Sequence, residues 1–391
     1  MMPLARVDYS VSRAERRPMK VKRVKRFLKQ NTVLCVAFVA ALVTGFLVPP
    51  DREWLGYFDV KTLVCLFLTL AVICALRDIK FFSILSRKLV RLTGNLRGLS
   101  LALVYITFLG SMLIANDMAL ITFLPLGYFA LDVTKQQKHM AYVFILQNIS
   151  ANLGGMLTPF GNPQNLYLYS YFHIPTGDFL RVMLPPFLLA VALLTGCCLL
   201  LPRQSLRITE VFPEKLNGRR TALYLALFAL SILIVFRVIP YWIGLVLVPV
   251  VLLFADREAL LQVDYPLLAT FALFFIFAGN LSRVPAVHGF LSGLLRWDSL
   301  LVPVLSCQVI SNVPTAILLS RFTEDWRSLL LGVNIGGTGT LIASLASLIT
   351  FSEFRLLCPG QTRRYLGLFA ALNALFLAVM TLAARFLFPL F

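Results

Sequence analysis

Long apolar runs separated by short polar segments recur along nearly the whole chain. A helix that crosses a bilayer needs about 20 predominantly apolar residues. Seven continuous runs come close to or reach this length: 31–49, 58–76, 178–201, 221–239, 241–255, 265–280 and 365–388. Two further runs, 140–170 and 327–350, contain interruptions rich in glycine. The pattern therefore predicts an all-α polytopic membrane protein with about nine spans.

Two other apolar segments are interrupted near their centres by polar residues. Segment 98–132 contains Asn116–Asp117, and segment 299–323 contains Ser311–Asn312. The second segment is too short for two full crossings, which need about 20 residues each. We therefore expect two re-entrant hairpins, each of which enters the membrane and returns to the same side.

Composition and charge place the chain in a membrane and orient it. The 391 residues are 59% hydrophobic and only 14% charged, with a mean hydropathy of +0.83, which excludes an ordinary soluble protein. Residues 1–30 hold ten Lys or Arg and two acidic residues. Positive charge favours the cytoplasmic side, so we expect a cytoplasmic N-terminus next to lipid headgroups, an external C-terminus and a bacterial-type inner membrane. Nucleic acid is not an expected partner.

A short pattern occurs twice with a constant offset of 182 residues. The first copy is ANLGGMLTPFGNPQNL at 151–166, and the second is VNIGGTGTLIASLASL at 333–348. Each copy follows an interrupted segment, and the positive-inside rule gives the copies opposite orientations. The expected organisation is a basic tail at 1–30, a first inverted repeat at 31–201, a linker with a connecting helix at 202–240, and a second inverted repeat at 241–391.

The interruptions have a physical consequence inside a membrane. Glycine and proline unwind a helix and free backbone N–H and C=O groups, which must then face a cavity enclosed by protein. Helix N-termini there favour an anion, and free carbonyl groups favour a small cation. The alternative interpretation is that the glycine pairs only allow close helix packing.

Four motifs resemble the ion-transporter superfamily, which includes divalent-anion/sodium symporters, citrate transporters, arsenite permeases and sodium/proton antiporters. The motifs are AND at 115–117, NLGGMLTPFGNPQN at 152–165, ISNVPT at 310–315 and NIGGTGTLIASLAS at 334–347. The resemblance covers most of the chain, from about residue 58. It implies a scaffold, a transport domain that moves like an elevator, and a homodimer formed through the scaffold.

The motifs and the physical argument together predict the site. The expected substrate- and ion-binding residues are Asn116, Asp117, Thr122, Asn152, Gly154, Gly155, Thr158, Asn162, Asn165, Ser311, Asn312, Thr315, Asn334, Gly336, Gly337, Thr338, Thr340 and Ser344. Sodium is expected near Asn116, Asp117 and Gly155, and near Asn312 and Gly337. No cofactor is expected beyond sodium or a proton as the coupling ion.

The first hairpin departs from the symporter pattern. The related symporters carry Ser-Asn-Thr at each tip, whereas this chain has Ala115–Asn116–Asp117 in the first copy. A carboxylate at membrane depth usually faces a cavity or a partner, and it can bind a proton or sodium. Alternatively, Asp117 caps the second arm of the hairpin. The two interpretations are compatible.

The expected function is secondary active transport. The cargo would be a small anion, such as citrate, a dicarboxylate or an inorganic oxyanion, coupled to sodium or protons. Alternatives are a sodium/proton antiporter, an arsenite-type efflux permease or a passive channel. No nucleotide-binding loop, catalytic triad or paired-carboxylate pattern indicates an enzyme.

Overall fold

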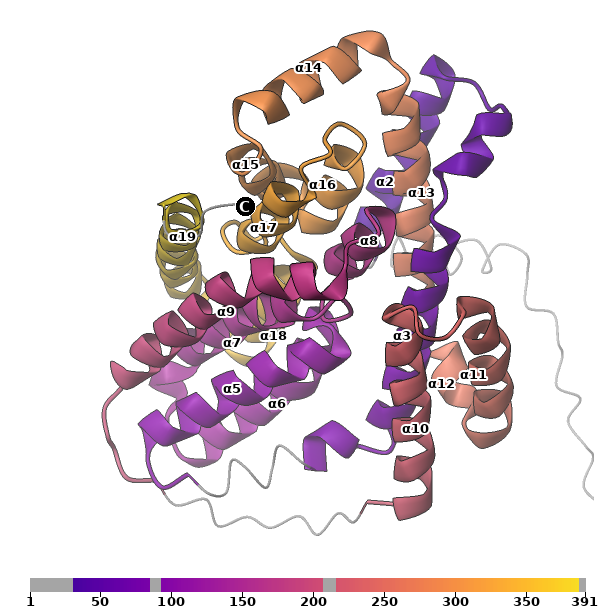
Figure 1. The fold of residues 1–391 in the computed structure, drawn as a ribbon. Coiled ribbons are helices and arrows are strands. Elements are labelled where there is room, and N and C mark those ends of the chain that lie inside the picture. Colours follow the sequence, from indigo (N-terminus) through magenta and orange to yellow (C-terminus); the bar gives the residue numbers. More distant parts are fainter. Residues whose placement is uncertain (1–30, 85–92, 207–215, 387–391) are drawn as a thin grey trace, which may run out of the picture.

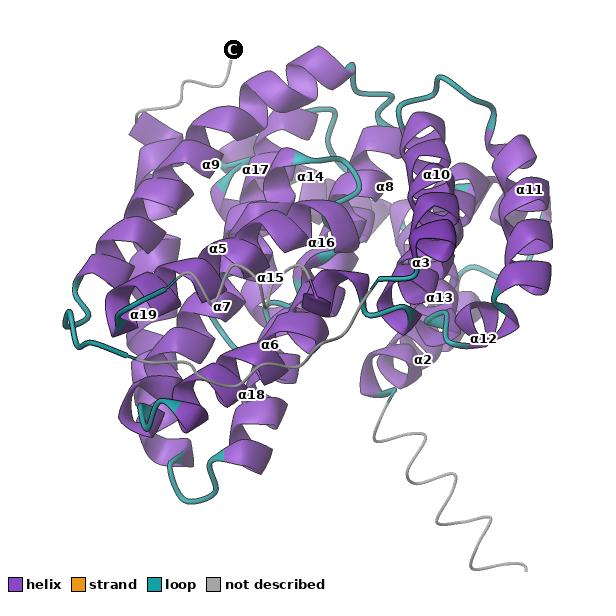
Figure 2. Cartoon of the chain, turned by 90° about the horizontal axis from the view of Figure 1, so that it is seen from below, coloured by secondary structure: helices purple, strands orange, loops and turns teal. Residues whose placement is uncertain are grey.

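The computed structural model describes residues 31–84, 93–206 and 216–386. The predicted basic tail at 1–30 and part of the linker, 207–215, lie outside the described residues. Within the described ranges the chain forms helices joined by loops and no extended strand (Figure 2). One isolated β-bridge joins Asn95 to Ser205. The prediction of an all-α protein is confirmed.

Six helical stretches in the described residues are long and apolar enough to cross a membrane. They are α3 (Val60–Asp78), α5 (Leu96–Ile114), α9 (Thr176–Leu199), α10 (Gly218–Val235), the stretch Arg257–Ser282 and α19 (Thr362–Phe386). Three shorter apolar helices are α2 (Thr32–Leu47), α11 (Tyr241–Ala255) and α15 (Leu301–Ile310). The protein is therefore an integral membrane protein. Nine full spans remain a prediction, and α5 by itself has the length of a span although it was expected to be a hairpin arm.

The helices form two groups, which lie side by side in Figure 1. In the first group α2 packs along α13 (Tyr265–Ser282), and α3 packs against α10, α11 and α12 (Arg257–Leu261). We call this group the scaffold. It also includes the short helix η1 (Arg52–Tyr57).

The second group, which we call the repeat bundle, contains both predicted hairpins and both broken helices. It comprises α5, α6 (Asn116–Val133), η2 (Gln137–His139), α7 (Met140–Gly154), η3 (Gly155–Leu157), α8 (Pro163–Tyr171), α9, α15, α16 (Asn312–Leu319), α17 (Trp326–Gly336), α18 (Leu345–Leu357) and α19. Helix α14 (Pro285–Trp297) connects the scaffold to the bundle across one end (Figure 1). The groups touch where α13 packs on α16 and α3 packs on α8.

A single residue reverses the chain in each predicted hairpin. Ala115 lies between α5 and α6 with φ 62°, and Ser311 lies between α15 and α16 with φ 71°. Non-glycine residues seldom adopt a positive φ. Its occurrence at two matching positions indicates that the chain makes the same kind of turn in both segments. In both cases the next residue, Asn116 or Asn312, begins the second arm. The arms pack against each other, so each segment is a helical hairpin.

Both Gly-Gly segments interrupt a helix as expected. Helix α7 ends at Gly154, and after η3 and a loop the chain resumes as α8 behind Asn162. Helix α17 ends at Gly336, and α18 begins behind Ser344, whose hydroxyl accepts a hydrogen bond from the Ser347 N–H. The resumed helices cross over, because α8 packs on hairpin arm α16 and α18 packs on hairpin arm α6. Each half of the bundle therefore completes the other.

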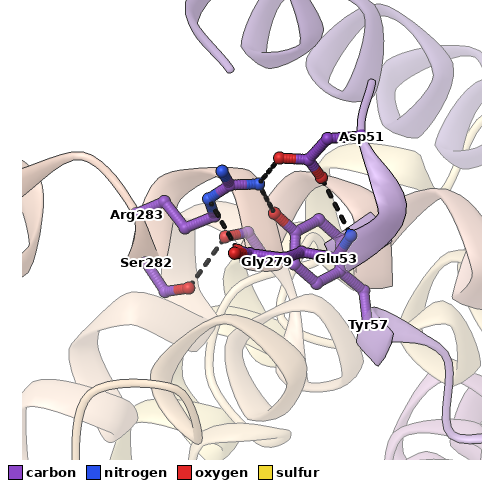
Figure 3. A network of polar contacts seen from close by, with 6 residues as sticks. All are labelled: Asp51, Glu53, Tyr57, Gly279, Ser282 and Arg283. Atoms are coloured by element: carbon purple, nitrogen blue, oxygen red, sulfur yellow. Dashed lines mark hydrogen bonds and ion pairs between the residues drawn. The ribbon is translucent and has the colours of Figure 1, made fainter. Parts of the chain in front are cut away.

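A polar network fastens η1 to the end of α13 (Figure 3). The Arg283 guanidinium lies 2.7 Å from an Asp51 carboxylate oxygen and 3.2 Å from a Glu53 oxygen, and it donates to the Tyr57 hydroxyl at 3.1 Å. The Tyr57 ring lies directly over Gly279, where a Cβ would come within 2.4 Å of it. The hydrogen bond from Arg283 holds the pKa of Asp51 below its ordinary value of 3.8.

We predict that Asp51→Asn slightly destabilises the protein. Because the pKa of Asp51 is lowered in the native state, its contribution is complete above pH 3.8 and is lost as the pH falls through the lowered pKa. The pair is exposed, so the apparent melting temperature at pH 7 should fall by about 2 °C or less. Thermal unfolding in detergent at pH 7 and pH 3 measures this effect, and the difference between variant and parent should shrink at pH 3. Asp178→Asn, which removes an exposed pair with Arg181 at 4.0 Å, is the control.

Candidate functional site

The two helix breaks are joined by buried asparagine side chains at the ends of the interrupted helices. The Asn162 amide donates to the Asn334 side-chain oxygen at 3.3 Å. The Asn334 amide donates to the Asn165 side-chain oxygen at 2.6 Å. All three side chains are buried. The two Gly-Gly segments, 182 residues apart in the sequence, are therefore neighbours in space.

The tip of the first hairpin joins the same set of contacts. The Asn116 amide donates to the Asn152 side-chain oxygen at 3.2 Å, and the Asn162 amide donates to the Asn152 backbone carbonyl at 3.3 Å. We call the connected residues the asparagine network: Asn116, Asn152, Asn162, Asn165 and Asn334. This network links one hairpin tip to both helix breaks.

Asparagine amides also satisfy backbone groups that the first break frees. The Asn165 amide lies within hydrogen-bonding distance of three carbonyls, those of Gly155 and Met156 at 3.2 Å and that of Thr158 at 3.4 Å. An unpaired buried carbonyl would cost about 1–3 kcal/mol. Asn165 thus stabilises the interrupted backbone in addition to contacting Asn334.

The second hairpin tip closes onto its own break. The Asn312 N–H donates to the Ala343 carbonyl at 3.0 Å, and the Ser311 hydroxyl donates to the same oxygen at 3.3 Å. Asn312 also lies beside Gly337, where a Cβ would stand 3.1 Å from its amide nitrogen. The starts of α16 and α18 are therefore held together.

Close packing explains part of the glycine pattern. A Cβ at Gly154 would lie 2.3 Å from the Phe108 carbonyl of α5, and one at Gly336 would lie 2.9 Å from Cys307 of α15. Each of these glycines brings a broken helix against the first arm of its hairpin. Gly155 differs, because its Cβ would lie 2.4 Å from the Asn162 side-chain oxygen. The packing interpretation therefore applies to Gly154 and Gly336, while Gly155 borders the asparagine network.

Asp117 lies in the first turn of α6, directly after Asn116. Its N–H donates to the Asn116 side-chain oxygen at 3.0 Å. One carboxylate oxygen is buried and has no hydrogen-bond partner in the described part of the chain, and the same holds for the side-chain oxygen of Asn162. The N-cap of α6 is Ala115, which makes no side-chain capping hydrogen bond, and the charge of Asp117 is favourable at this helix start.

Three predicted hydroxyls lie outside the asparagine network. Thr122 donates to the Met118 carbonyl, Thr315 to the Ser311 carbonyl and Thr338 to the Ile335 carbonyl. Each acceptor lies three or four residues earlier in the chain. Such bonds leave hydroxyl lone pairs available but do not connect the residues to the network. Ser344 is placed at the start of α18 beside Ser347, with 3.1 Å between the hydroxyl oxygens.

The sequence analysis missed two polar residues of this region. The Asn148 amide of α7 donates to the Ser347 hydroxyl of α18 at 3.2 Å, which adds a second contact between the repeats. Gln308 of α15 donates to the carbonyls of Gly336 and Thr338 at 2.9 and 3.2 Å. A signal existed in both cases, because each is an amide within a largely apolar helical run.

Broken helices and hairpin tips that gather buried polar groups within an integral membrane bundle define a transporter-type architecture. The family model for citrate transporters, CitMHS, matches residues 26–324. The chain belongs to this citrate transporter family. Its family members are transporters, and the chain is not an enzyme.

Individual relatives agree with this assignment. The chain is 32% identical over 296 residues to an uncharacterized transporter of Methanocaldococcus jannaschii, and the matched region covers 74% of this chain and 80% of the relative. It is 28% identical to the inner membrane protein YbiR of Escherichia coli, over 83% of this chain and 88% of the relative. A shorter match, 31% identical over 38% of this chain and 30% of the relative, is to the silicon efflux transporter LSI3 of Oryza sativa.

We predict that Asn334→Ala loosens both helix breaks. The substitution removes hydrogen bonds to Asn162 and Asn165, so the free energy of unfolding should fall by about 1–3 kcal/mol. Hydrogen–deuterium exchange should rise in 152–165 as well as around residue 334. Asn280→Ala is the matched control, because Asn280 is also buried but donates to Thr44 within the scaffold. Unchanged exchange at 152–165 in Asn334→Ala would contradict the prediction.

Proposed function

We propose that the protein is a secondary active transporter that moves a small anion across the membrane, coupled to sodium or protons. The observation that carries the proposal is the gathering of four helix starts at the two breaks. Helices α6 and α8 start at residues of the asparagine network. Helix α16 starts at Asn312, which contacts Ala343, and α18 starts directly after Ser344. Asn162 and Asn148 connect the two pairs.

Helix starts supply the attraction that an anion needs. A helix start has N–H groups without a partner inside the helix, and it carries a partial positive charge equivalent to about half an elementary charge. Apart from the Asp117 carboxylate in the first turn of α6, the polar groups that surround them are amides, hydroxyls and backbone groups. We infer that a carboxylate or an inorganic oxyanion is bound by these dipoles and amides, with a bound cation supplying the remaining charge. Citrate is the first candidate because of the family.

Coupling is assigned to the first hairpin. Asp117 supplies a buried carboxylate oxygen, and Asn162 supplies a buried amide oxygen beside Gly155, both without a donor in the described residues. Oxygen ligands of this kind suit sodium, and a carboxylate also takes up a proton. The predicted second sodium position near Asn312 and Gly337 is retained in the proposal.

The scaffold and the repeat bundle would move relative to each other as in an elevator, with a cytoplasmic N-terminus, an external C-terminus and a scaffold dimer. The contacts of α13 with α16 and of α3 with α8 are where this sliding would occur.

A second candidate function is efflux of a weak oxyacid, such as silicic acid or arsenite, coupled to protons through Asp117. It is favoured by the similarity to the silicon efflux transporter and by the carboxylate at the first hairpin. A sodium/proton antiporter uses the same residue without an organic cargo. These functions differ in which solute or ion must be present on the other side of the membrane for exchange to occur.

Counterflow in proteoliposomes separates these possibilities. Vesicles loaded with unlabelled citrate should accumulate external labelled citrate, with rates that depend on sodium or pH. Silicic acid, arsenite and succinate are tested in parallel. Counterflow of silicic acid or arsenite alone would replace the first proposal with the second. Sodium-driven proton movement without any of these solutes would identify an antiporter, and conductance without counterflow would identify a channel.

We predict that Asp117→Asn abolishes or uncouples ion-driven transport. The substitution keeps the size of the side chain but removes the charge, so the dependence of uptake on sodium or pH should fall at least about tenfold, in line with the loss of one charged ligand. Asp132→Asn, an exposed carboxylate at the other end of the same helix, is the control and should behave like the parent. Unchanged ion dependence in Asp117→Asn would remove this residue from the coupling mechanism.

A further inference from the structure

Two threonine hydroxyls make the same hydrogen bond in the two halves of the bundle. Thr158 donates to the Met112 carbonyl at 2.8 Å, and Thr340 donates to the Gln308 carbonyl at 3.0 Å. Each acceptor lies four residues before the asparagine that starts the second hairpin arm, Asn116 or Asn312. Because donor and acceptor are equivalent in both repeats, we infer that the two threonines have the same geometric role.

The acceptors are carbonyls that the hairpin turn leaves without a helical partner. Helix α5 ends at Ile114 and α15 ends at Ile310, so Met112 and Gln308 both belong to the last four residues of a helix. Carbonyls at these positions have no N–H four residues further along the helix. The threonines satisfy them from the loop of the neighbouring broken helix.

We propose that Thr158 and Thr340 are positioning residues that tie each hairpin tip to its own helix break, and that this tie is weaker in the first repeat. Sequence analysis placed both threonines among the ligand-binding residues. The structure uses their hydroxyls as donors within the protein, so they act on the site through the tips that they hold.

The difference between the repeats comes from the residue at the acceptor position. In the second repeat Gln308 also accepts from the Thr340 N–H at 2.9 Å through its side-chain oxygen, while its amide contacts the loop carbonyls described above. Gly339, with φ 124°, lets the loop wrap around this side chain, because a Cβ would lie 2.1 Å from the Gln308 oxygen. The first repeat has Met112 at the same position, and a thioether donates no hydrogen bond.

The tip turns reinforce this difference. Ser311 adds a hydroxyl contact to the Ala343 carbonyl, whereas the matching residue of the first hairpin, Ala115, has no side-chain donor. The first tip is therefore the compliant wall of the proposed site, and the second tip is the fixed wall. This assignment rests on the proposed function only in treating the tips as walls of a binding site.

Hydrogen–deuterium exchange of the full-length protein in nanodiscs tests the ties without any ligand. Thr158→Val keeps the size of the side chain but removes the hydroxyl. We expect about 2- to 10-fold faster exchange in 113–119, with little change in 309–315, because one net hydrogen bond is lost. Thr158→Ser should restore the parental rate. Thr340→Val should have a smaller effect on 309–315.

Gln308→Met provides the matched second arm, because it gives the second repeat the residue found in the first. In this background Thr340→Val should accelerate exchange in 309–315 as strongly as Thr158→Val accelerates 113–119. Equal exchange in Thr158→Val and the parent would overturn the proposal. Faster exchange of Thr158→Val throughout the bundle, including α9 and α19, would also overturn it in favour of a general structural role.

A parallel measurement keeps this inference separate from the proposed function. The thermal shift produced by sodium citrate, compared with choline chloride, is recorded for each variant. A smaller shift in Thr158→Val than in Thr158→Ser supports the action of the tie on the site. If the parent shows no shift while the exchange results are as expected, the tie stands and the proposed citrate and sodium site is wrong.

Discussion

The structure depends on one constraint: polar backbone groups released by a helix break cannot be left in hydrocarbon. Lipid offers no hydrogen bonds, so every freed N–H or C=O must be satisfied within the protein. Asparagine suits this task because its side chain carries both donors and an acceptor. Asn165 contacts three carbonyls of the first break and also accepts from Asn334 of the second repeat. The same residues that make the breaks tolerable therefore also hold the two repeats together.

The resumed helices also pack across the two repeats. Helix α8, with nine residues, contacts α3 of the first repeat and α17 of the second. It packs on α16 of the other hairpin, where the Tyr167 hydroxyl lies 2.8 Å from that of Ser320. Helix α18 does the same on α6. Neither repeat forms a complete bundle without the other, so the polar centre exists only in the assembled molecule.

Membership of the citrate transporter family and the geometry of the centre address different questions. The family establishes a transporter and an integral membrane protein. The centre suggests how a solute would be held, through helix starts and neutral amides, with Asp117 as the charged group within it. The two repeats share a backbone plan but differ in side chains, since Met112 and Ala115 stand where the second repeat has Gln308 and Ser311. A site built from similar halves can thereby have one wall that yields more readily than the other.

Local sequence determined the helices, the two interruptions and the two hairpins. Glycine, proline and asparagine act on their own backbone, so breaks at Gly154 and Gly336 and turns before Asn116 and Asn312 could be predicted from residue type and spacing. The partners of the side chains could not. Nothing in the spacing indicates that Asn334 bonds to Asn162 and Asn165, because that contact depends on how the two repeats pack. The hydroxyls of Thr158 and Thr340 were predicted to bind ligand, and only the tertiary structure placed a carbonyl from a separate helix within their reach. The sequence specified where the chain must bend, and packing between distant segments decided which polar groups meet there.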